Sequence, residues 1–376
     1  MATQSQIRRM NQRKVIKIMM RLGSASRAQL AKATRMSQAT VGRIVDDLLA
    51  EQVLSEATGA RIHVRPLAES APIGRPSTRL ELNRSKKRFL AIQLGVHQTR
   101  LGVLPLAVAD NQEWAISLAT SSNPTEWASA VTAAAKKLHT KGLEALVISL
   151  PGVVDEHACK VLLSPNLQWT ERVDLPAMLA PLTQAPIISI QEIRALALGH
   201  LAAEPHEEDF LLVDIGSGVG AAAVIASKLY RGPLPLSGEL GHTPILGNQK
   251  RCGCGGTGCV ETLISRDALI EAAGENNSGR NWDELVEAVR LRGLPNWLKR
   301  VLDATAATIA GALNVLGLRR VIITGALAEI AGAADYLASS INKGSLWARF
   351  GDITCKTAPR RRMGGMVCAA IDEVLL

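Results

Sequence analysis

The chain has 376 residues, a net charge of +9 at pH 7 and 47% hydrophobic residues. That length allows two or three domains with a substantial core. No apolar run is long enough to span a membrane, and the charged first residues lack the apolar core of a signal peptide. These features argue against membrane insertion and secretion, and they predict a cytoplasmic protein.

The positive charge is concentrated toward the N-terminus. Residues 1–90 contain 18 Lys and Arg against 6 Asp and Glu, a net +12, whereas the rest of the chain has a net charge of −3. A basic segment joined to a nearly neutral one indicates a polyanionic partner for the basic segment. A solvated basic surface is the alternative, so the helix pattern has to decide between them.

The N-terminal segment predicts three helices. Residues 11–22 place apolar side chains on one helical face, and Ser26 and Gln29 form a capping box for a second, short helix. Ser37 can cap a third helix. The apolar stripe of that helix consists of Val41, Ile44, Val45 and Leu48. Two short helices joined by a tight turn after a longer helix are typical of a helix-turn-helix motif.

The third helix carries polar side chains that suit a double-stranded DNA operator. In this motif its N-terminal half reaches base edges, where Gln can pair with adenine, Arg with guanine, and Thr can contact a thymine methyl group. The predicted DNA-binding residues are Arg27, Ser37, Gln38, Thr40 and Arg43. A helical scaffold or dimerisation unit with incidental arginines is the alternative, and the charge asymmetry favours DNA.

Two predicted strands, residues 53–57 and 78–82, flank a polar insert over residues 59–76. They predict a wing beside the third helix, with arginines for the minor groove or phosphates; a flexible linker is the alternative. Those arginines are Arg61, Arg65, Arg75 and Arg79. A basic run then marks a junction, so we predict a winged helix-turn-helix domain over residues 1–88.

The second predicted domain, residues 89–376, has the pattern of an α/β protein. Apolar β-rich runs alternate with Ala-rich helical stretches, and a short turn between the first two runs predicts a mixed sheet. The runs are residues 89–96, 101–107, 145–150, 187–190, 210–215 and 321–324, and the helical stretches include 127–139 and 304–316. A Gly-rich turn over residues 214–220 could expose N–H groups to a phosphate, although alone it is a weak signal.

Cys252, Cys254 and Cys259 lie within eight residues, among glycines, with His242 ten positions upstream of Cys252. Three thiolates and one imidazole are a closed, tetrahedral ligand set of structural zinc sites. A disulfide interpretation requires an even pairing, and Cys252 and Cys254 are too close to bridge comfortably. The sequence therefore predicts a structural Zn²⁺ site in a loop over residues 242–259.

The same segment carries a family resemblance. Residues 237–243 (SGELGHT) and 252–261 (CGCGGTGCVE) resemble the signature of the ROK family of repressors, open reading frames and sugar kinases. Other matching segments are residues 150–155, 164–169, 195–199 and 215–221. The helix-turn-helix followed by GRPSTRLELN resembles the repressor branch, whose members respond to N-acetylglucosamine, glucose or xylose. The resemblance implies an α/β, actin-like ATPase (ribonuclease H-like) fold with two lobes.

The resemblance also implies a sugar pocket. Its ligand-binding residues would be Gly152, Gln191, Glu192, Glu239, His242 and Glu261. His242 would use one ring nitrogen for zinc and the other for the sugar, and the carboxylates suit a polyol because each accepts two hydroxyl hydrogen bonds. Gln191 and Glu192 replace the usual Asn-Asp pair of the family. A retained zinc fold with a vestigial pocket is the alternative.

Three elements depart from the pattern of the family's kinases. Gln93 replaces the acidic residue of the phosphate turn, and Val96 and His97 replace its small pair. Glu192 stands at the position of the catalytic base, where its extra methylene should cost a rate factor on the order of a hundred. Residues 325–327 replace a Gly-rich adenosine contact. We therefore expect no catalytic residue and no enzyme activity.

Together these features predict a DNA-binding transcriptional regulator, a repressor, of carbohydrate metabolism. A sugar or sugar phosphate in the kinase-like cleft would change the spacing of the DNA-binding domains in a homodimer or homotetramer. A ROK sugar kinase with a regulatory front end is the first alternative. The second is a regulator controlled by a protein partner that docks on the zinc-supported domain.

Overall fold

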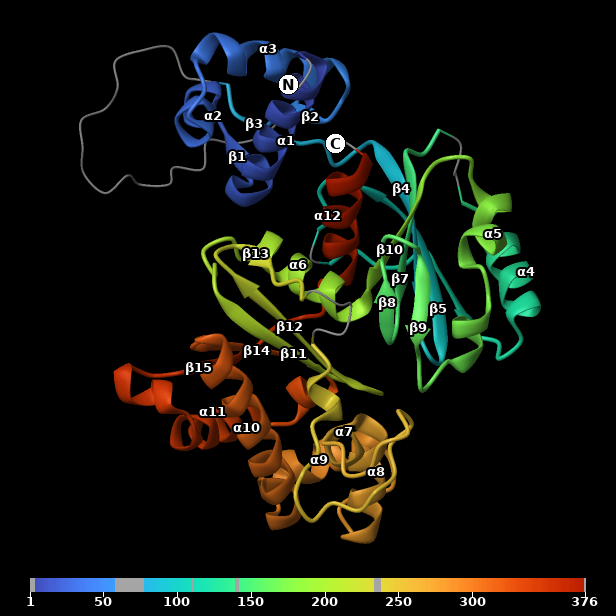
Figure 1. The fold of residues 1–376 in the computed structure, drawn as a ribbon, viewed down its shortest axis with the longest axis vertical. Coiled ribbons are helices and arrows are strands. Elements are labelled where there is room, and N and C mark those ends of the chain that lie inside the picture. The colour runs from blue at the N-terminus through green and yellow to red at the C-terminus, as the bar shows by residue number, and fades with distance from the viewer. Residues whose placement is uncertain (1–3, 58–77, 110, 139–141, 233–237, 375–376) are drawn as a thin grey trace.

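The computed structural model describes residues 4–57, 78–109, 111–138, 142–232 and 238–374 (Figure 1). Its N-terminal end folds into three helices: α1 Gln4–Leu22, α2 Arg27–Thr34 and α3 Gln38–Ala50. Ser26 and Gln29 form the predicted capping box at the start of α2, and Ser37 caps α3. The predicted helix-turn-helix order is confirmed. The first helix begins at Gln4, earlier than the predicted start near residue 11. Its first turns are mostly polar and lack apolar periodicity, so the sequence pattern did not reveal them.

A small sheet packs beside these helices. Its strands are β1 Ser24–Ala25, β2 Leu54–Glu56 and β3 Leu80–Leu82, in the order β1-β3-β2, and both pairs are antiparallel. The two strands predicted to flank a wing therefore do pair. Arg61, Arg65 and Arg75 of the predicted insert lie outside the described residues, as do Ser237 and His139.

The second part of the chain contains two five-stranded mixed sheets. In the first sheet the order is β10-β7-β4-β5-β6, with β4, β5 and β6 antiparallel and β4, β7 and β10 parallel. In the second sheet β13-β12-β11-β14-β15 repeats the same arrangement. The duplicated sheet confirms the two-lobed α/β prediction.

The strands of the first sheet are β4 Lys87–Leu94, β5 Gln98–Pro105, β6 Ile116–Ala119, β7 Ala145–Leu150 and β10 Ile187–Gln191. Those of the second are β11 Phe210–Ile215, β12 Val219–Ile225, β13 Lys228–Leu229, β14 Arg320–Gly325 and β15 Thr354–Thr357. A separate hairpin joins β8 Val153–Asp155 and β9 Lys160–Leu163.

Helices cover both faces of each sheet, which explains why the central strands read as continuous apolar runs. On the first sheet, α4 and α5 pack on one face and α12 packs on the other. On the second sheet, α10 and α11 pack on one face and α6 packs on the other. The helices are α4 Pro124–Ala135, α5 Leu175–Leu179, α6 Glu192–Ala203, α7 Glu261–Ile264, α8 Arg266–Glu275, α9 Trp282–Arg292, α10 Asn296–Leu316, α11 Ala333–Gly344 and α12 Arg362–Val374. Within the described ranges, none of the helices is both long enough and apolar enough to cross a bilayer.

Helices α6 and α12 lie between the two sheets and touch through glycines. A Cβ atom added at Gly365 would lie 1.7 Å from the carbonyl oxygen of Ala195, and one added at Gly199 would lie 1.9 Å from that of Arg361. No side chain fits at such distances, so the absence of a Cβ sets the spacing of these two helices.

The helix-turn-helix shares one continuous core with the first lobe. Val15 and Met19 of α1 belong to the same buried cluster as Phe89 of β4 and Met366 of α12. Figure 1 shows α12 directly below the N-terminal helices, and Lys17 Nζ lies 2.6 Å from Asp372 Oδ1 of α12.

A buried arginine closes the same junction. Arg88 is 2% exposed, forms an ion pair with Glu144 and donates through Nη2 to the Glu51 carbonyl oxygen at 2.7 Å. The helix-turn-helix is therefore packed onto the first lobe and its helix α12.

Candidate functional site

A cleft of about 580 Å³ lies between the two lobes. Its walls come from the ends of β4, β7 and β10, the first turn of α6, the Gly-rich turn between β11 and β12, and the loop that precedes α7. The six residues predicted to bind ligand all line this cleft: Gly152, Gln191, Glu192, Glu239, His242 and Glu261. Their assembly from distant segments agrees with the prediction, and their roles remain predictions.

One end of the cleft adjoins a cluster of potential metal ligands. The ligand atoms of His242, Cys252, Cys254 and Cys259 all lie within 4.8 Å of one another. The Cys254 and Cys259 sulfurs are 3.7 Å apart, and the Cys252 sulfur is 3.6 Å from His242 Nδ1. A tetrahedral zinc ion with ordinary bond lengths separates two sulfurs by about 3.8 Å and a sulfur from a nitrogen by about 3.6 Å. The cluster could therefore hold a metal ion of that size and geometry.

The chemistry of the sulfurs also fits a cation. All three cysteines are free thiols. Burial, followed by the neighbouring sulfurs of Cys254 and Cys252, raises the pKa of Cys259 to about 12. Deprotonation of more than one of these thiols is unfavourable without a cation, because the resulting thiolates would repel one another. A bound divalent cation favours deprotonation, because it binds the thiolates.

His242 faces the metal cluster with one nitrogen and the cleft with the other. Its Nε2 lies 3.8 Å from Glu239 Oε2, on the side opposite the contact of Nδ1 with Cys252. Glu239 also accepts a hydrogen bond from Gln191 Nε2 at 3.2 Å, and the same amide donates to the Gly152 carbonyl oxygen at 2.8 Å. Burial raises the pKa of Glu239 above its usual value. These contacts form a polar chain along the cleft wall.

Glu261 is placed by the same loop, two residues after Cys259. Its Oε2 accepts a hydrogen bond from the Val219 N–H at 2.7 Å, which ties it to the Gly-rich turn. A metal held by the cluster would therefore fix His242, Glu239 and Glu261 relative to one another. The resulting row of oxygens and an imidazole can bind several hydroxyl groups.

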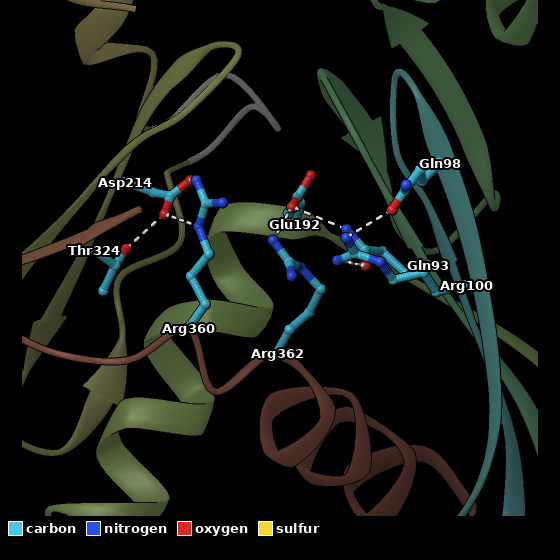
Figure 2. Close-up of polar contacts among 8 residues, drawn as sticks. All are labelled: Gln93, Gln98, Arg100, Glu192, Asp214, Thr324, Arg360 and Arg362. Carbon is cyan, nitrogen blue, oxygen red and sulfur yellow. Dashed lines mark hydrogen bonds and ion pairs between the residues drawn. The ribbon is translucent and has the colours of Figure 1, made fainter. Parts of the chain in front are cut away.

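Glu192 begins α6 on the floor of the cleft, but it is not free (Figure 2). It forms an ion pair with Arg362 and accepts from Gln93 Nε2 at 3.4 Å. A general base needs a carboxylate oxygen directed at the substrate proton. Both contacts are made to the same carboxylate oxygen, Oε1, so the carboxylate is already engaged by a guanidinium.

Asp214, at the end of β11, is also occupied by an arginine. Arg360 donates to both of its oxygens at 2.7 and 2.8 Å, and Thr324 donates to it at 2.6 Å. The Arg360 guanidinium also lies against the Gly-rich turn, since a Cβ atom on Gly216 would come within 2.3 Å of its Nη2. This side chain therefore lies beside the turn that the sequence offered to a phosphate.

Sequence reasoning did not identify the arginines that dominate this half of the cleft. They are Arg100 of β5 and Arg360 and Arg362 at the start of α12. A signal was present for the last two, because residues 360–362 are three consecutive arginines at a helix N-terminus, where acidic residues are favoured. Arg100 has no such local signal.

The predicted DNA-binding residues divide into two groups. Gln38 and Arg43 are exposed on α3, outside its buried stripe. Ser37 and Thr40 bond each other at 2.8 Å and cap the helix. Arg27 is held by Asp46 at 2.7 Å. Gln38 and Arg43 are thus exposed side chains that take no part in this capping or in the ion pair with Asp46.

Comparisons with known proteins agree with this architecture. The ROK family model matches residues 89–369. The xylose repressor of Bacillus subtilis is 24% identical over 343 residues, which cover 87% of this chain and 85% of the repressor.

Two solved structures share the fold. A ROK family transcriptional regulator, described as a homologue of the E. coli Mlc protein, has a TM-score of 0.73 at 20% identity and covers 98% of both chains. A ROK family glucokinase from Streptomyces griseus has a TM-score of 0.58 at 21% identity, over 75% of this chain and 97% of the kinase. The regulator thus shares the fold of nearly the whole chain, and the kinase shares three quarters of it.

Proposed function

Because the chain belongs to the ROK family, we propose that it is a DNA-binding transcriptional repressor of carbohydrate metabolism that responds to a sugar in its interlobe cleft. The observation that carries the proposal is the helix-turn-helix packed in one core with α12, whose first residue lines the cleft. The repressor name of a relative that matches 87% of this chain supports it.

DNA binding would use α3 in the major groove. Gln38 and Arg43 reach base edges in this arrangement, and a homodimer presents two copies of α3 to the half-sites of a pseudo-palindromic operator. Ser37 and Thr40 fix the start of the helix, and Arg27 holds α2 against α3 through Asp46. The excess of positive charge in residues 1–90 supplies sequence-independent attraction to phosphates.

An Arg43→Ala variant should bind a selected operator about 10- to 100-fold more weakly, because one bidentate Arg–guanine contact is worth about 1–3 kcal/mol. Fluorescence anisotropy of a labelled duplex measures this change. Arg290→Ala is the matched control, because Arg290 is an exposed arginine on α9, paired with Glu287 and far from α3. Equal affinity of Arg43→Ala and wild type would remove α3 as the recognition helix.

The metal in the cluster is zinc in this proposal, and the sugar lies beside it. The ligand set of three sulfurs and one imidazole selects zinc over the harder cations Mg²⁺ and Ca²⁺. His242 would present Nε2, and Glu239 and Glu261 their carboxylates, to the sugar hydroxyls. The metal supplies rigidity to the loop, and the residues make the contacts.

Phosphoryl transfer is not part of the proposal. Arg362 already engages one carboxylate oxygen of Glu192, and Gln93 provides no carboxylate for a magnesium ion. Arg360 lies on the Gly-rich turn where a nucleotide phosphate would need the backbone N–H groups. These contacts favour a sensor over a sugar kinase.

The start of α12 offers a route from the cleft to the DNA-binding helices. Residues 360–362 line the cleft through Arg360 and Arg362, and they also line a second cavity of about 290 Å³. Met19 and Leu82 of the DNA-binding domain form part of that second cavity. A ligand that binds one lobe angle more tightly would move α12 and change the spacing of the two α3 helices.

The proposal is tested with the full-length chain and duplexes selected from a genomic library. Operator affinity is measured with xylose, glucose, N-acetylglucosamine and their phosphorylated forms at several concentrations. We expect specific duplexes to be recovered and at least one sugar to change operator affinity by fivefold or more, within the range of typical allosteric coupling. Recovery of no specific duplex, or ATP-dependent phosphorylation of a sugar that Glu192→Gln abolishes, would contradict it.

A further inference from the structure

The half of the cleft around Glu192 and Asp214, away from His242, carries more cationic than anionic side chains. Arg360 is matched by Asp214, and Arg362 is matched by Glu192. Arg100 contacts neutral amide oxygens instead, Gln98 Oε1 at 2.9 Å and Gln93 Oε1 at 3.5 Å. Figure 2 shows Arg100 and Arg362 extending from different elements toward Glu192. This part of the cleft therefore has one guanidinium without a carboxylate partner among the described residues.

Arg362 also keeps an unused donor. It is 6% exposed, and its Nε atom is buried without a hydrogen-bond partner. A buried, unpaired N–H of a charged group is costly unless a partner arrives. The geometry thus leaves donors from two arginines in the same half of the cleft.

The electrostatic environment of Arg100 points the same way. Burial and the neighbouring Arg362 guanidinium lower the pKa of Arg100. Arg360 and Arg362 also lie at the start of α12, whose first turn contains no acidic residue, so the positive end of the helix dipole adds to their charge. The Arg100 and Arg362 guanidinium groups therefore repel each other, and a bound anion would reduce that repulsion.

We propose that Arg100 and Arg362 form a subsite for the phosphate monoester of a phosphorylated sugar effector. The sugar ring would lie toward Glu239, His242 and Glu261, and the phosphate would lie beside Glu192. Guanidinium groups suit this task because each can donate two parallel hydrogen bonds to a phosphate. The inference deepens the proposed function and rests on it, since it names the chemical class of the effector.

Phosphate fits the subsite better than the other anions that a cleft of this kind could accept. Glu192 already compensates Arg362, so a useful ligand must compete with a carboxylate, and a dianion does so more strongly than a sugar carboxylate. A nucleotide is disfavoured because Arg360 is bonded to Asp214 and lies against Gly216 of the turn.

The test is isothermal titration calorimetry of the full chain, which measures the affinity for each member of matched pairs of neutral and phosphorylated sugars. The pairs are glucose with glucose 6-phosphate, N-acetylglucosamine with N-acetylglucosamine 6-phosphate, and xylose with xylose 5-phosphate. Gluconate, inorganic phosphate and ATP are the remaining probes. We expect at least one sugar phosphate to bind tenfold or more tightly than its neutral partner, and more tightly than gluconate, inorganic phosphate or ATP.

Variants then locate the subsite. Arg100→Gln should lower the affinity for that sugar phosphate about 10- to 100-fold and leave the affinity for its neutral partner within twofold, because only the phosphate contact is lost. Arg100→Lys should restore part of the affinity. Arg362→Lys keeps a cation beside Glu192 but cannot donate two parallel hydrogen bonds, so it should also weaken binding of the sugar phosphate. Arg290→Gln is the control and should bind as wild type does.

The outcomes separate the inference from the proposed function. If a neutral sugar binds as tightly as its phosphate and shifts operator affinity, the phosphate subsite is wrong and the sugar sensor stands. If gluconate, ATP or inorganic phosphate equals or exceeds every sugar phosphate, or if Arg100→Gln changes nothing, the subsite is also wrong. If no probe binds while the chain still binds its operator specifically, the subsite is overturned together with the sugar-sensing half of the proposed function.

Discussion

A Cys254→Ser variant is expected to contain less than a tenth of the zinc found in the wild-type protein, which should carry about one ion per chain. Loss of one thiolate opens a closed four-ligand shell, and such a shell contributes on the order of 10 kcal/mol to local folding. Elemental analysis by mass spectrometry after gel filtration measures the zinc content directly. Cys355→Ser, a cysteine on β15 outside the cluster, is the matched control and should keep the metal.

The structural consequence should reach beyond the loop. His242 belongs to the cluster, Glu239 lies three residues before it and Glu261 two residues after Cys259, so their positions in the cleft depend on the loop. We expect Cys254→Ser to lose its response to sugar while its operator affinity changes by less than about threefold, because α3 packs far from the cluster. A variant that retained full zinc and a full sugar response would show that the cluster is not a metal site.

A Gly365→Ala substitution is expected to lower the free energy of unfolding by about 3 kcal/mol, although alanine favours helix formation more than glycine does. The added Cβ would lie 1.7 Å from the Ala195 carbonyl oxygen, so α6 and α12 must separate. Overpacking typically costs about 1–3 kcal/mol, and here the obstacle is backbone rather than a side chain that can rotate. Thermal and urea unfolding followed by circular dichroism measure the effect.

Gly311→Ala provides the control for this substitution. Gly311 also lies inside a helix, α10, but nothing lies within 4 Å of a Cβ atom added there. Helix propensity alone should then stabilise the protein by up to about 1 kcal/mol. Opposite signs at the two glycines would establish that the contact between α6 and α12 is sterically set. Equal stabilisation at both positions would show that the contact between α6 and α12 can accommodate a Cβ atom.

Features that are local in sequence were predictable. The caps at Ser26 and Ser37 and the stripe from Val41 to Leu48 defined the helix-turn-helix, because capping and helical periodicity act within a few residues. The spacing of the three cysteines likewise pointed to the metal cluster. The six cleft residues came from the family resemblance, which carries positions that no local rule connects.

The contacts that distinguish this cleft join residues far apart in the chain. Arg362 meets Glu192 across 170 positions, and Arg360 meets Asp214 across 146. No periodicity or spacing rule can pair such residues, because the fold brings them together. The family resemblance drew attention to Gln93 and Glu192, but it did not reveal the arginine that contacts Glu192.

The junction of α1, β4 and α12 limits how this protein can be dissected. The three elements bury their side chains in a common interior, and Lys17 and Arg88 bridge the same seam. If residues 1–88 were fused to a sugar kinase of similar fold, the apolar side chains of α1 would lack the α12 side chains that they pack against here. A chimaera that keeps operator specificity should therefore require the outward face of the recipient's last helix to be exchanged as well. The N-terminal helices and α12 therefore have to be transferred together in any such chimaera.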